Sequence, residues 1–416
     1  MSSKTILALA LVLIGGPVAA DTPPPAPAAI EIPAPTGPFK IGTTRWVVTD
    51  AARPETFAAP GVHRQVEVLA WYPTTAAARG EMAPYLREGL TEVPPGMRAA
   101  FGALSGVRTH AILDAPPAES PAKLPVLVFS HGFGGIPSSY TALLEDLASH
   151  GYAVLSVVHP YEATAATVAD GQVVSLFDAA GKPGPAFGAV LTEWAHEDES
   201  MASVTREPTE EGQLRLLRGY LAGLRATNAT LERWVADTKL VLDRLPELAK
   251  DGAAGRLAAR LDLGRLGAFG HSMGGVTSGQ FCLDDHRCRA GLNLDGIPQY
   301  GAMIDRRLSV PFLMVYSARP GRTGASDAIY RRAATRYDRV DVRDTLHLDF
   351  SDMILWGGPL RQGALGTLAP ARAVEITRAI VLQYFDRELL GKPAPLLAGK
   401  ETLPEVTVRS FSQTAK

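Results

Sequence analysis

Two hydrophobic patterns follow one another along most of the chain. Short continuous apolar runs, at residues 125–130 and 153–158, are typical of strands that are buried on both faces of a parallel sheet. Between them, residues 138–150 repeat their apolar side chains at helical spacing, and Gly151 follows as a stop signal. Because strands and helices alternate, the pattern predicts an α/β fold, with a mostly parallel sheet covered by helices on both faces.

The same patterns continue toward the carboxyl end. A helix is predicted where apolar residues between Leu231 and Leu245 share one face, and Asn228 is available as its N-cap. The remaining predicted strands are residues 45–49, 66–71, 266–269, 290–294 and 310–316, and the remaining helices are 273–282 and 371–388. Residues 162–226 do not fit this rhythm, because they are more polar and carry an acidic cluster at 193–199. We expect an insertion packed over one end of the sheet, and a lid and a solvated decoration both remain open.

The amino-terminal segment has the features of a targeting sequence rather than of a folded element. Lys4 precedes an apolar run that is too short to span a bilayer, and small residues end at Ala20. Residues 1–20 are therefore predicted to be a secretory signal peptide. Residues 21–38 carry seven prolines and are predicted to form an extended, mobile linker without a core of its own. The α/β domain is then expected over residues 39–416, in a secreted or periplasmic protein.

Composition narrows the function classes for this chain of 416 residues. Hydrophobic residues make up 46% and charged residues 20%, which supplies a large core and excludes disorder for most of the chain. The formal net charge of −2 argues against a general nucleic-acid binder. The two cysteines, Cys282 and Cys288, exclude a disulfide-dense scaffold. In an exported protein we expect them to form a disulfide across a short turn, with two free buried thiols as the alternative.

One sharp turn carries the candidate chemistry. Residues 270–274 read Gly-His-Ser-Met-Gly, which matches G-x-S-x-G between a short apolar strand and a predicted helix. Gly270 and Gly274 are needed because side chains there would clash with the neighbouring strand and helix. In this context the motif indicates the nucleophile elbow of an α/β-hydrolase fold, with Ser272 as the nucleophile and His271 in the supporting turn. The alternative is a glycine-rich loop with a structural serine.

The nucleophile needs a base, and the base needs an acid that orients it. In this fold the acid and then the histidine follow the serine along the chain. Only His286 and His347 follow Ser272, and His347 is the predicted base because it lies in the loop after a Val-rich strand. Asp295 is the predicted acid because it closes an apolar strand, and Asp327 is its rival.

The oxyanion of a tetrahedral intermediate needs two backbone N–H donors. Met273, directly after the nucleophile, is the first predicted donor. The second is Phe133, in the turn after the strand at 125–130, where Gly132 lets the backbone approach the substrate. His131 is predicted to brace this turn rather than to act as a base. No cofactor is expected, and neither H-E-x-x-H nor clustered His/Asp spacing supports a metal site.

Four segments together resemble the plasma-type platelet-activating factor acetylhydrolases, the lipoprotein-associated phospholipases. They are VLVFSHGFGGIPSSYTALLEDLASHGYAVLSVVHP at 126–160, GHSMGG at 270–275, residues 288–295 and LHLDF at 346–350. The resemblance implies a calcium-independent serine esterase acting on short or oxidised acyl chains at the second position of glycerophospholipids. It also agrees with Asp295 as the acid.

The resemblance is less complete where acyl groups bind. Gly296-Ile297-Pro298 follows the acid where bulky aromatic residues are usual, and Met273 stands where Phe would be usual. The expected partner is a small-molecule or lipid ester, and the alternative is a general carboxylesterase or a cutinase-like polyesterase. A non-catalytic binding protein on the same scaffold ranks last, because all three triad residues are present. Peripheral membrane contact stays open, since no clear basic amphipathic helix is evident.

Overall fold

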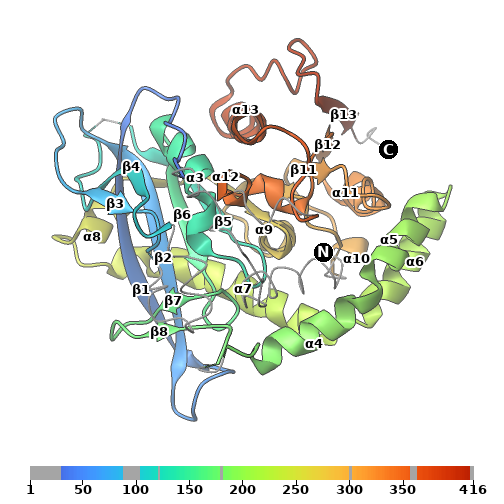
Figure 1. The fold of residues 1–416 in the computed structure, drawn as a ribbon, viewed down its shortest axis with the longest axis horizontal. Helices are drawn as coiled ribbons and strands as arrows, with labels where there is room; N and C mark the ends of the chain where they lie inside the picture. Colours follow the sequence, from blue (N-terminus) through green and yellow to red (C-terminus); the bar gives the residue numbers. More distant parts are fainter. Residues whose placement is uncertain are drawn as a thin grey trace, which may run out of the picture.

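The computed structural model describes residues 30–87, 104–119, 122–178, 181–298, 302–356 and 363–412. The predicted signal peptide and the first part of the predicted linker lie outside these ranges. Within them, eleven strands form one sheet in the order β13-β12-β11-β10-β9-β5-β6-β2-β1-β4-β3 (Figure 1). The run from β6 through β12 is parallel, and β2 and β13 pair antiparallel on either side of it. The prediction of a mostly parallel sheet is confirmed.

The sheet and its helices have well-defined bounds. The strands are β1 Lys40–Pro54, β2 His63–Thr74, β3 Met82–Pro84, β4 Arg108–Leu113, β5 Leu124–Ser130, β6 Ala153–Val158, β9 Leu261–His271, β10 Cys288–Leu294, β11 Phe312–Ser317, β12 Arg336–Val342 and β13 Val406–Ser412. The main helices are α3 Thr141–Ser149, α7 Arg225–Arg244, α8 Ala253–Ala258, α9 Met273–Asp284, α10 Ala302–Asp305, α11 Asp327–Ala333, α12 Met353–Trp356 and α13 Pro370–Leu390. No helix in the described ranges is long and apolar enough to cross a membrane.

Each central strand presents alternate side chains to two separate cores. In β5, Val126 and Val128 belong to the core shared with α7 and α9. Leu127 and Phe129 point the other way, into the core shared with α3 and α13. A strand that is covered on both faces buries every side chain, which is why it reads as a continuous apolar run. The predicted strands and helices are confirmed for this reason, with ends that differ by a few residues.

The edge strand β13 was not among the predicted elements. It pairs antiparallel with β12 over its whole length. Val406 and Val408 pack against the core, and polar residues alternate with them. The sequence of β13 therefore offers only alternating apolar and polar residues. This pattern predicts a strand less strongly than the continuous apolar runs of the central strands do.

The predicted N-cap of α7 is wrong. The helix begins three residues before Asn228, and the N–H of Asn228 already donates to the carbonyl oxygen of Leu224 at 2.9 Å. The first free N–H groups, those of Ala226 and Thr227, donate instead to the Glu193 carboxylate at 2.7 and 2.9 Å. A carboxylate from another helix therefore caps α7, which no local sequence pattern reveals.

The predicted mobile linker is also wrong for residues 30–38, which dock onto the domain. Ile32 is buried in the core beside α3 and α13. The N–H and hydroxyl of Thr36 donate to Asp146 Oδ1 at 2.7 and 2.9 Å. Arg378 of α13 donates to two backbone carbonyl oxygens of the segment. Prolines keep this stretch extended, but two of its carbonyls accept hydrogen bonds from Arg378, and Ile30 and Ile32 pack on the core.

The predicted disulfide is confirmed. Cys282 and Cys288 are bonded, with their Cα atoms 5.0 Å apart. The bond joins the last turn of α9 to the first residue of β10. It thereby closes the connection between the two elements that follow the G-x-S-x-G turn.

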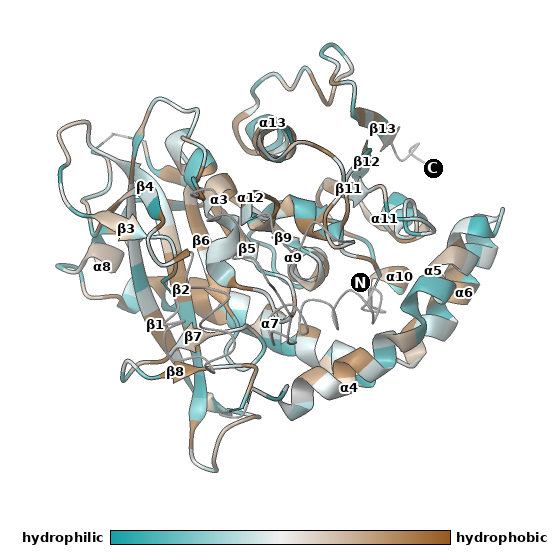
Figure 2. Cartoon of the chain, viewed as in Figure 1, coloured by the Kyte–Doolittle hydropathy of each residue, from teal (hydrophilic) through white to brown (hydrophobic). Residues whose placement is uncertain are grey.

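The interrupting segment, residues 162–226, forms a small hairpin and then a chain of helices. The hairpin pairs β7 Ala166–Thr167 with β8 Val173–Val174. The helices are α4 Pro185–Glu193, α5 Glu197–Arg206 and α6 Glu210–Ala222. Figure 1 shows these helices as an arm that reaches from the region of α7 toward α10 and α11. In Figure 2 the arm carries both hydrophobic and hydrophilic stretches, as expected of helices with one packed face.

Candidate active site

Three residues that the sequence singles out meet at one edge of the sheet. Ser272 follows β9, Asp295 follows β10, and His347 begins the short helix η6 (His347–Phe350) after β12. The strands from β9 to β12 are parallel neighbours, so their carboxyl ends lie at the same edge. In open α/β sheets this edge is where functional sites form.

The backbone of Ser272 is held in a strained turn. Its φ and ψ are 57° and −126°, a region that side-chain-bearing residues rarely adopt. Its N–H donates to the carbonyl oxygen of Leu294 at 2.8 Å. A Cβ on Gly274 would lie 2.0 Å from the carbonyl oxygen of Ser130, and one on Gly270 would lie 2.3 Å from the carbonyl carbon of Gly274. The tight strand–turn–helix therefore depends on both glycines, as the motif predicts.

The imidazole of His347 is fixed by Asp295. Its Nδ1 lies 2.7 Å from Asp295 Oδ2, and both side chains are buried. The N–H of Ser317 donates to Oδ1 at 2.8 Å, and its hydroxyl donates to Oδ2 at 3.0 Å. A carboxylate in this position selects the tautomer that carries its proton on Nδ1, which leaves Nε2 free to accept a proton.

The second imidazole nitrogen is still unengaged. Nε2 of His347 is buried and has no hydrogen-bond partner among the described residues, Ser272 included. Serine–histidine hydrogen bonds are often long in free enzymes and tighten when substrate binds. The structure therefore shows the contact between Asp295 and His347, and the contact between His347 and Ser272 stays a prediction.

Burial and neighbouring charges set the protonation of the pair. Burial acts to raise the pKa of the Asp295 carboxyl, but the Arg319 guanidinium and the hydrogen bond from His347 hold it well below its usual range. Burial lowers the pKa of His347 well below its ordinary value, and the charges of Arg319 and His271 add to that shift. The Asp295 carboxylate opposes the shift without outweighing burial. The pair is then a carboxylate and a neutral imidazole, which is the state that a general base requires.

The two predicted oxyanion donors lie beside the serine. Met273 is the first residue of α9, and Phe133 follows Gly132 in the turn after β5. A Cβ added to Gly132 would lie 3.3 Å from Ser272 Cβ, so this backbone passes close to the predicted nucleophile. Within the described part of the chain, neither the Phe133 nor the Met273 N–H has an acceptor. Two free donors beside a serine hydroxyl suit a developing negative charge.

Two histidines brace the turns around the serine. His131 lies 2.8 Å from the carbonyl oxygen of Gly132 through Nδ1, and its Nε2 accepts the N–H of His159 at 3.2 Å. Burial, with a contribution from His159, lowers the pKa of His131 to about 3, so it stays neutral. His271 contacts the carbonyl oxygen of His347 through Nε2 at 2.8 Å. Both histidines thus connect backbone segments of the site.

The two rival residues lie elsewhere. His286 is exposed in the turn between α9 and β10. The Asp327 carboxylate accepts hydroxyl hydrogen bonds from Tyr316 and Tyr337, at 3.0 and 2.7 Å, and pairs with Arg339 at 2.6 Å. Asp327 is therefore occupied on the face of the sheet that carries α11, and Asp295 is the carboxylate that reaches the histidine.

A buried charged network behind the oxyanion turn was missed by sequence reasoning. Arg64 of β2 pairs with Asp237 of α7 at 2.7 Å and with Glu55 at 3.0 Å. The same Asp237 carboxylate contacts His159 Nδ1 at 2.9 Å, and the His159 ring stacks on Trp234 at 4.0 Å. The N–H of His159 donates to His131, and His131 braces the turn after β5. The network therefore connects β2 and α7 to the turn that carries the predicted oxyanion donor Phe133. Its members are far apart in sequence, and no motif marks them.

Asp237→Asn is expected to lower the free energy of unfolding by about 3–5 kcal/mol, because it breaks the shortest ion pair of the buried Arg64 and removes the carboxylate that His159 contacts. Asp243→Asn on the same helix is the matched control. Asp243 pairs with Arg287 at 2.7 Å but its side chain is 58% exposed, so its loss is expected to cost less than about 1 kcal/mol. Denaturant unfolding of both variants measures the difference, and equal losses would contradict the role given to the network.

Comparisons with known proteins point to esterases. The family model described as "Platelet-activating factor acetylhydrolase, isoform II" matches residues 27–177. A platelet-activating factor acetylhydrolase of Cavia porcellus is 31% identical over 43% of this chain and 36% of its own length. That of Canis lupus familiaris is 25% identical over 59% of this chain and 52% of its own length. The chain is thus similar to platelet-activating factor acetylhydrolases over part of its length.

A solved structure extends the comparison over nearly the whole fold. A ferulic acid esterase from Streptomyces cinnamoneus superposes with a TM-score of 0.67, with 28% sequence identity over 92% of this chain and 99% of its own. The prediction of an α/β-hydrolase fold is confirmed. The curated acetylhydrolase relatives named above are matched over about half of their length or less.

The insertion packs against the candidate site. Phe187 stacks on Phe133 at a centroid distance of 5.8 Å, and Trp194 meets the same ring edge-on at 5.7 Å. Glu197, at the start of α5, pairs with the buried Arg322 at 2.9 Å. The insertion therefore covers the oxyanion turn and contacts the loop after β11, so a purely solvated decoration is excluded for it.

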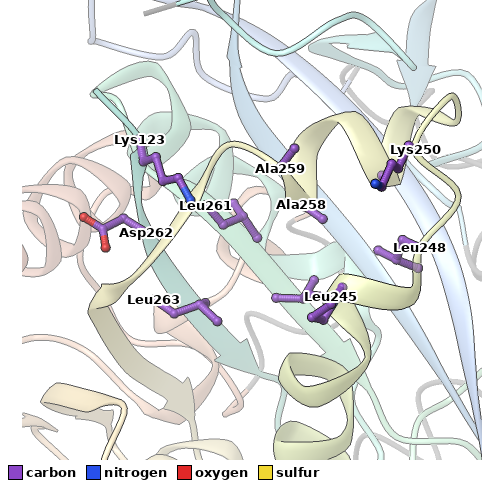
Figure 3. Close-up of a pocket in the computed structure, with 11 residues that line it drawn as sticks. Lys123, Leu245, Leu248, Lys250, Ala258, Ala259, Leu261, Asp262 and Leu263 are labelled. Carbon is purple, nitrogen blue, oxygen red and sulfur yellow. The ribbon is translucent and has the colours of Figure 1, made fainter. Parts of the chain in front are cut away.

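The protein also has a surface pocket of about 480 Å³, which is unrelated to this site (Figure 3). Leu245, Leu248 and Leu263 line it, with Lys123 and Lys250 at its rim. It lies at the amino ends of β5 and β9, at the edge of the sheet opposite the serine. Within the described ranges, no group of three His, Cys, Asp or Glu side chains is arranged to hold a metal ion.

Proposed function

We propose that this protein is a secreted serine esterase, which hydrolyses carboxylic esters through an acyl-serine intermediate. The observation that carries the proposal is the Asp295–His347 pair, at 2.7 Å, at the same sheet edge as a serine in a strained turn. The similarity to acetylhydrolases and the esterase structural neighbour support the same reaction class. No cofactor is needed for this chemistry.

The proposed reaction runs in two halves. Ser272 Oγ attacks the ester carbonyl carbon while His347 Nε2 takes the hydroxyl proton. The N–H groups of Phe133 and Met273 bind the oxyanion that forms. His347 then gives the proton to the departing alcohol, which leaves an acyl-serine. In the second half, water attacks the acyl carbonyl carbon while His347 takes its proton. The bond to Ser272 Oγ then breaks, His347 returns the proton to Oγ, and the carboxylic acid is released.

The proposed substrates are glycerophospholipids with a short or oxidised acyl chain. The short chain agrees with the names of the curated relatives, including a "probable 1-alkyl-2-acetylglycerophosphocholine esterase" of Arthroderma benhamiae, 20% identical over 91% of this chain. The oxidised chains come from the resemblance seen in the sequence. A general carboxylesterase is the second candidate. The ferulic acid esterase favours it, because that enzyme is similar over almost its entire length. The Gly296-Ile297-Pro298 segment and Met273 also favour it, because they depart from the lipid-cleaving pattern near the acyl group.

Export is part of the proposal. The predicted signal peptide supports it, and so does the disulfide between Cys282 and Cys288, because such bonds persist in oxidising compartments. The same pair of cysteines in the cytosol would be kept reduced.

The test is the rate of hydrolysis against acyl length, on matched p-nitrophenyl esters and phosphatidylcholines. If the protein acts on phospholipids as the acetylhydrolases do, a preference for short chains on the phospholipid is expected. Good turnover of simple esters with phospholipids untouched would establish the second candidate instead. If the purified protein hydrolyses neither series, the esterase proposal is wrong.

A further inference from the structure

A charged residue outside the proposed triad, Arg319, contacts its acid. It lies in the loop between β11 and α11, and its side chain is only 12% exposed. Its Nη2 lies 2.9 Å from Asp295 Oδ2 and donates to the backbone carbonyl oxygen of Asp295 at 3.2 Å. The contact is made to the acid itself and not to a neighbour of the acid.

Arg319 and the histidine share one carboxylate oxygen. His347 Nδ1 lies 2.7 Å from the same Oδ2 of Asp295. In a Ser-His-Asp triad the carboxylate stabilises the imidazolium that forms when the histidine takes a proton. A permanent cation on the same oxygen offsets part of that stabilisation, because it repels the imidazolium.

The side chain of Arg319 has no competing anchor. All of its side-chain hydrogen bonds go to Asp295, and within the described residues its Nε and Nη1 are buried without a partner. A guanidinium that served only to join two parts of the scaffold would be expected to satisfy its other nitrogens as well. Burial lowers the pKa of Arg319 while Asp295 opposes that shift. A group whose ordinary pKa is above about 12 stays protonated under these conditions.

The loop that carries Arg319 is fastened to the insertion. Arg322, three residues later, is fully buried and pairs with Glu197 Oε2 at 2.9 Å. The hydroxyl of Thr205, also on α5, donates to the carbonyl oxygen of Gly321 at 3.4 Å. Helix α5 therefore fixes the backbone that presents the arginine to the acid.

We propose that Arg319 is a positioning residue, which shares the Asp295 carboxylate with His347 and extends the active pH range toward acid pH. Helix α5 of the insertion holds the loop that carries it. The inference rests on the proposed serine-esterase function and adds to it a residue that sets the pH dependence. It also gives the insertion a role in the chemistry.

The direction of the effect follows from which charges face the histidine. The groups that face it from other elements are Asp295, Arg319 and His271. Removing the positive charge of Arg319 favours the imidazolium, so the pKa of His347 rises. Since only the neutral imidazole acts as the base, activity is then lost at a higher pH than before.

Two carboxylates in the loop of His347, Asp349 and Asp352, could also affect the pH profile. Asp349 accepts the N–H groups of Leu346 and Gly366, each at 2.8 Å. Burial raises the pKa of Asp352 to about 7, although hydrogen bonds from Ala142 and Tyr85 oppose it. Neither carboxylate contacts Arg319, so both are common to wild type and variants, and the difference between pH profiles isolates the arginine.

The experiment compares Arg319→Met, Arg319→Lys and wild type by kcat/KM against pH on a simple p-nitrophenyl ester. The acid limb of Arg319→Met is expected to move up by about one pH unit. Arg319→Lys keeps the charge and is expected to stay near wild type. Arg336→Met is the matched control, because Arg336 pairs with Glu388 and Asp338 at the opposite end of β12. An unshifted profile for Arg319→Met, or equal shifts for Met and Lys, would overturn the inference.

A second measurement keeps the inference testable without turnover. In a Ser272→Ala background, NMR titration of the His347 ring is expected to show the same upward shift when Arg319 is replaced. If wild type hydrolyses no ester, the proposed function fails, but this titration still tests the arginine. Glu197→Gln is expected to shift the profile part of the way toward Arg319→Met. A wild-type profile for Glu197→Gln would show that the loop is held without the insertion.

Discussion

Replacing Ser272 with alanine is expected to lower kcat for ester hydrolysis about a million-fold, which is the loss seen when a serine hydrolase loses its nucleophile. The strained turn presents no second hydroxyl to the ester carbonyl. The oxyanion donors remain in the variant, so a small activity above the uncatalysed rate is expected to persist. Single-turnover and steady-state assays on a short-chain ester measure the loss.

Ser200→Ala is the matched control for that experiment. The Ser200 hydroxyl donates an exposed hydrogen bond to the carbonyl oxygen of His196 within the insertion. Its removal is expected to leave kcat within about twofold of wild type, as surface substitutions usually do. If Ser272→Ala retained activity within about tenfold of wild type, another residue would be the nucleophile and the assignment would fail.

Asp295→Asn is expected to lower kcat by about 10⁴-fold with little change in fold. The N–H of Ser317 donates to Oδ1, so the amide oxygen of the variant takes that position and its NH₂ faces His347. A donor there forces the imidazole proton onto Nε2, which removes the base. The amide also faces the Arg319 guanidinium, so two donors oppose each other where an ion pair stood.

Asp327→Asn serves as the matched comparison, because Asp327 was the rival acid. Its carboxylate holds Tyr316, Tyr337 and Arg339, so the substitution is expected to reduce stability while kcat changes by less than about tenfold. Parallel pH-rate profiles and thermal unfolding separate the two effects. If the activity losses of the two variants were exchanged, the acid would be Asp327.

The sheet was readable because its central strands are buried on both faces. In runs such as residues 125–130 and 153–158, alternate apolar side chains pack into two different cores. Each strand can therefore be recognised from its own short segment of sequence. The half-buried strand β13 shows only an alternation of apolar and polar residues, which is a weaker pattern, and it was not predicted. The capping of α7 by Glu193, from a different helix, had no local signal at all.

The sequence by itself determined the α/β fold, the strained turn at Ser272 and the order in which candidate acid and base follow it. It could do so because glycine spacing, strand burial and the scarcity of later histidines are local or countable properties. Only the tertiary structure decided which charges surround the pair and where the insertion packs. Arg319, Glu197 and Asp237 act through contacts between distant segments, and buried electrostatics depends on distance and desolvation, neither of which is written in the order of residues.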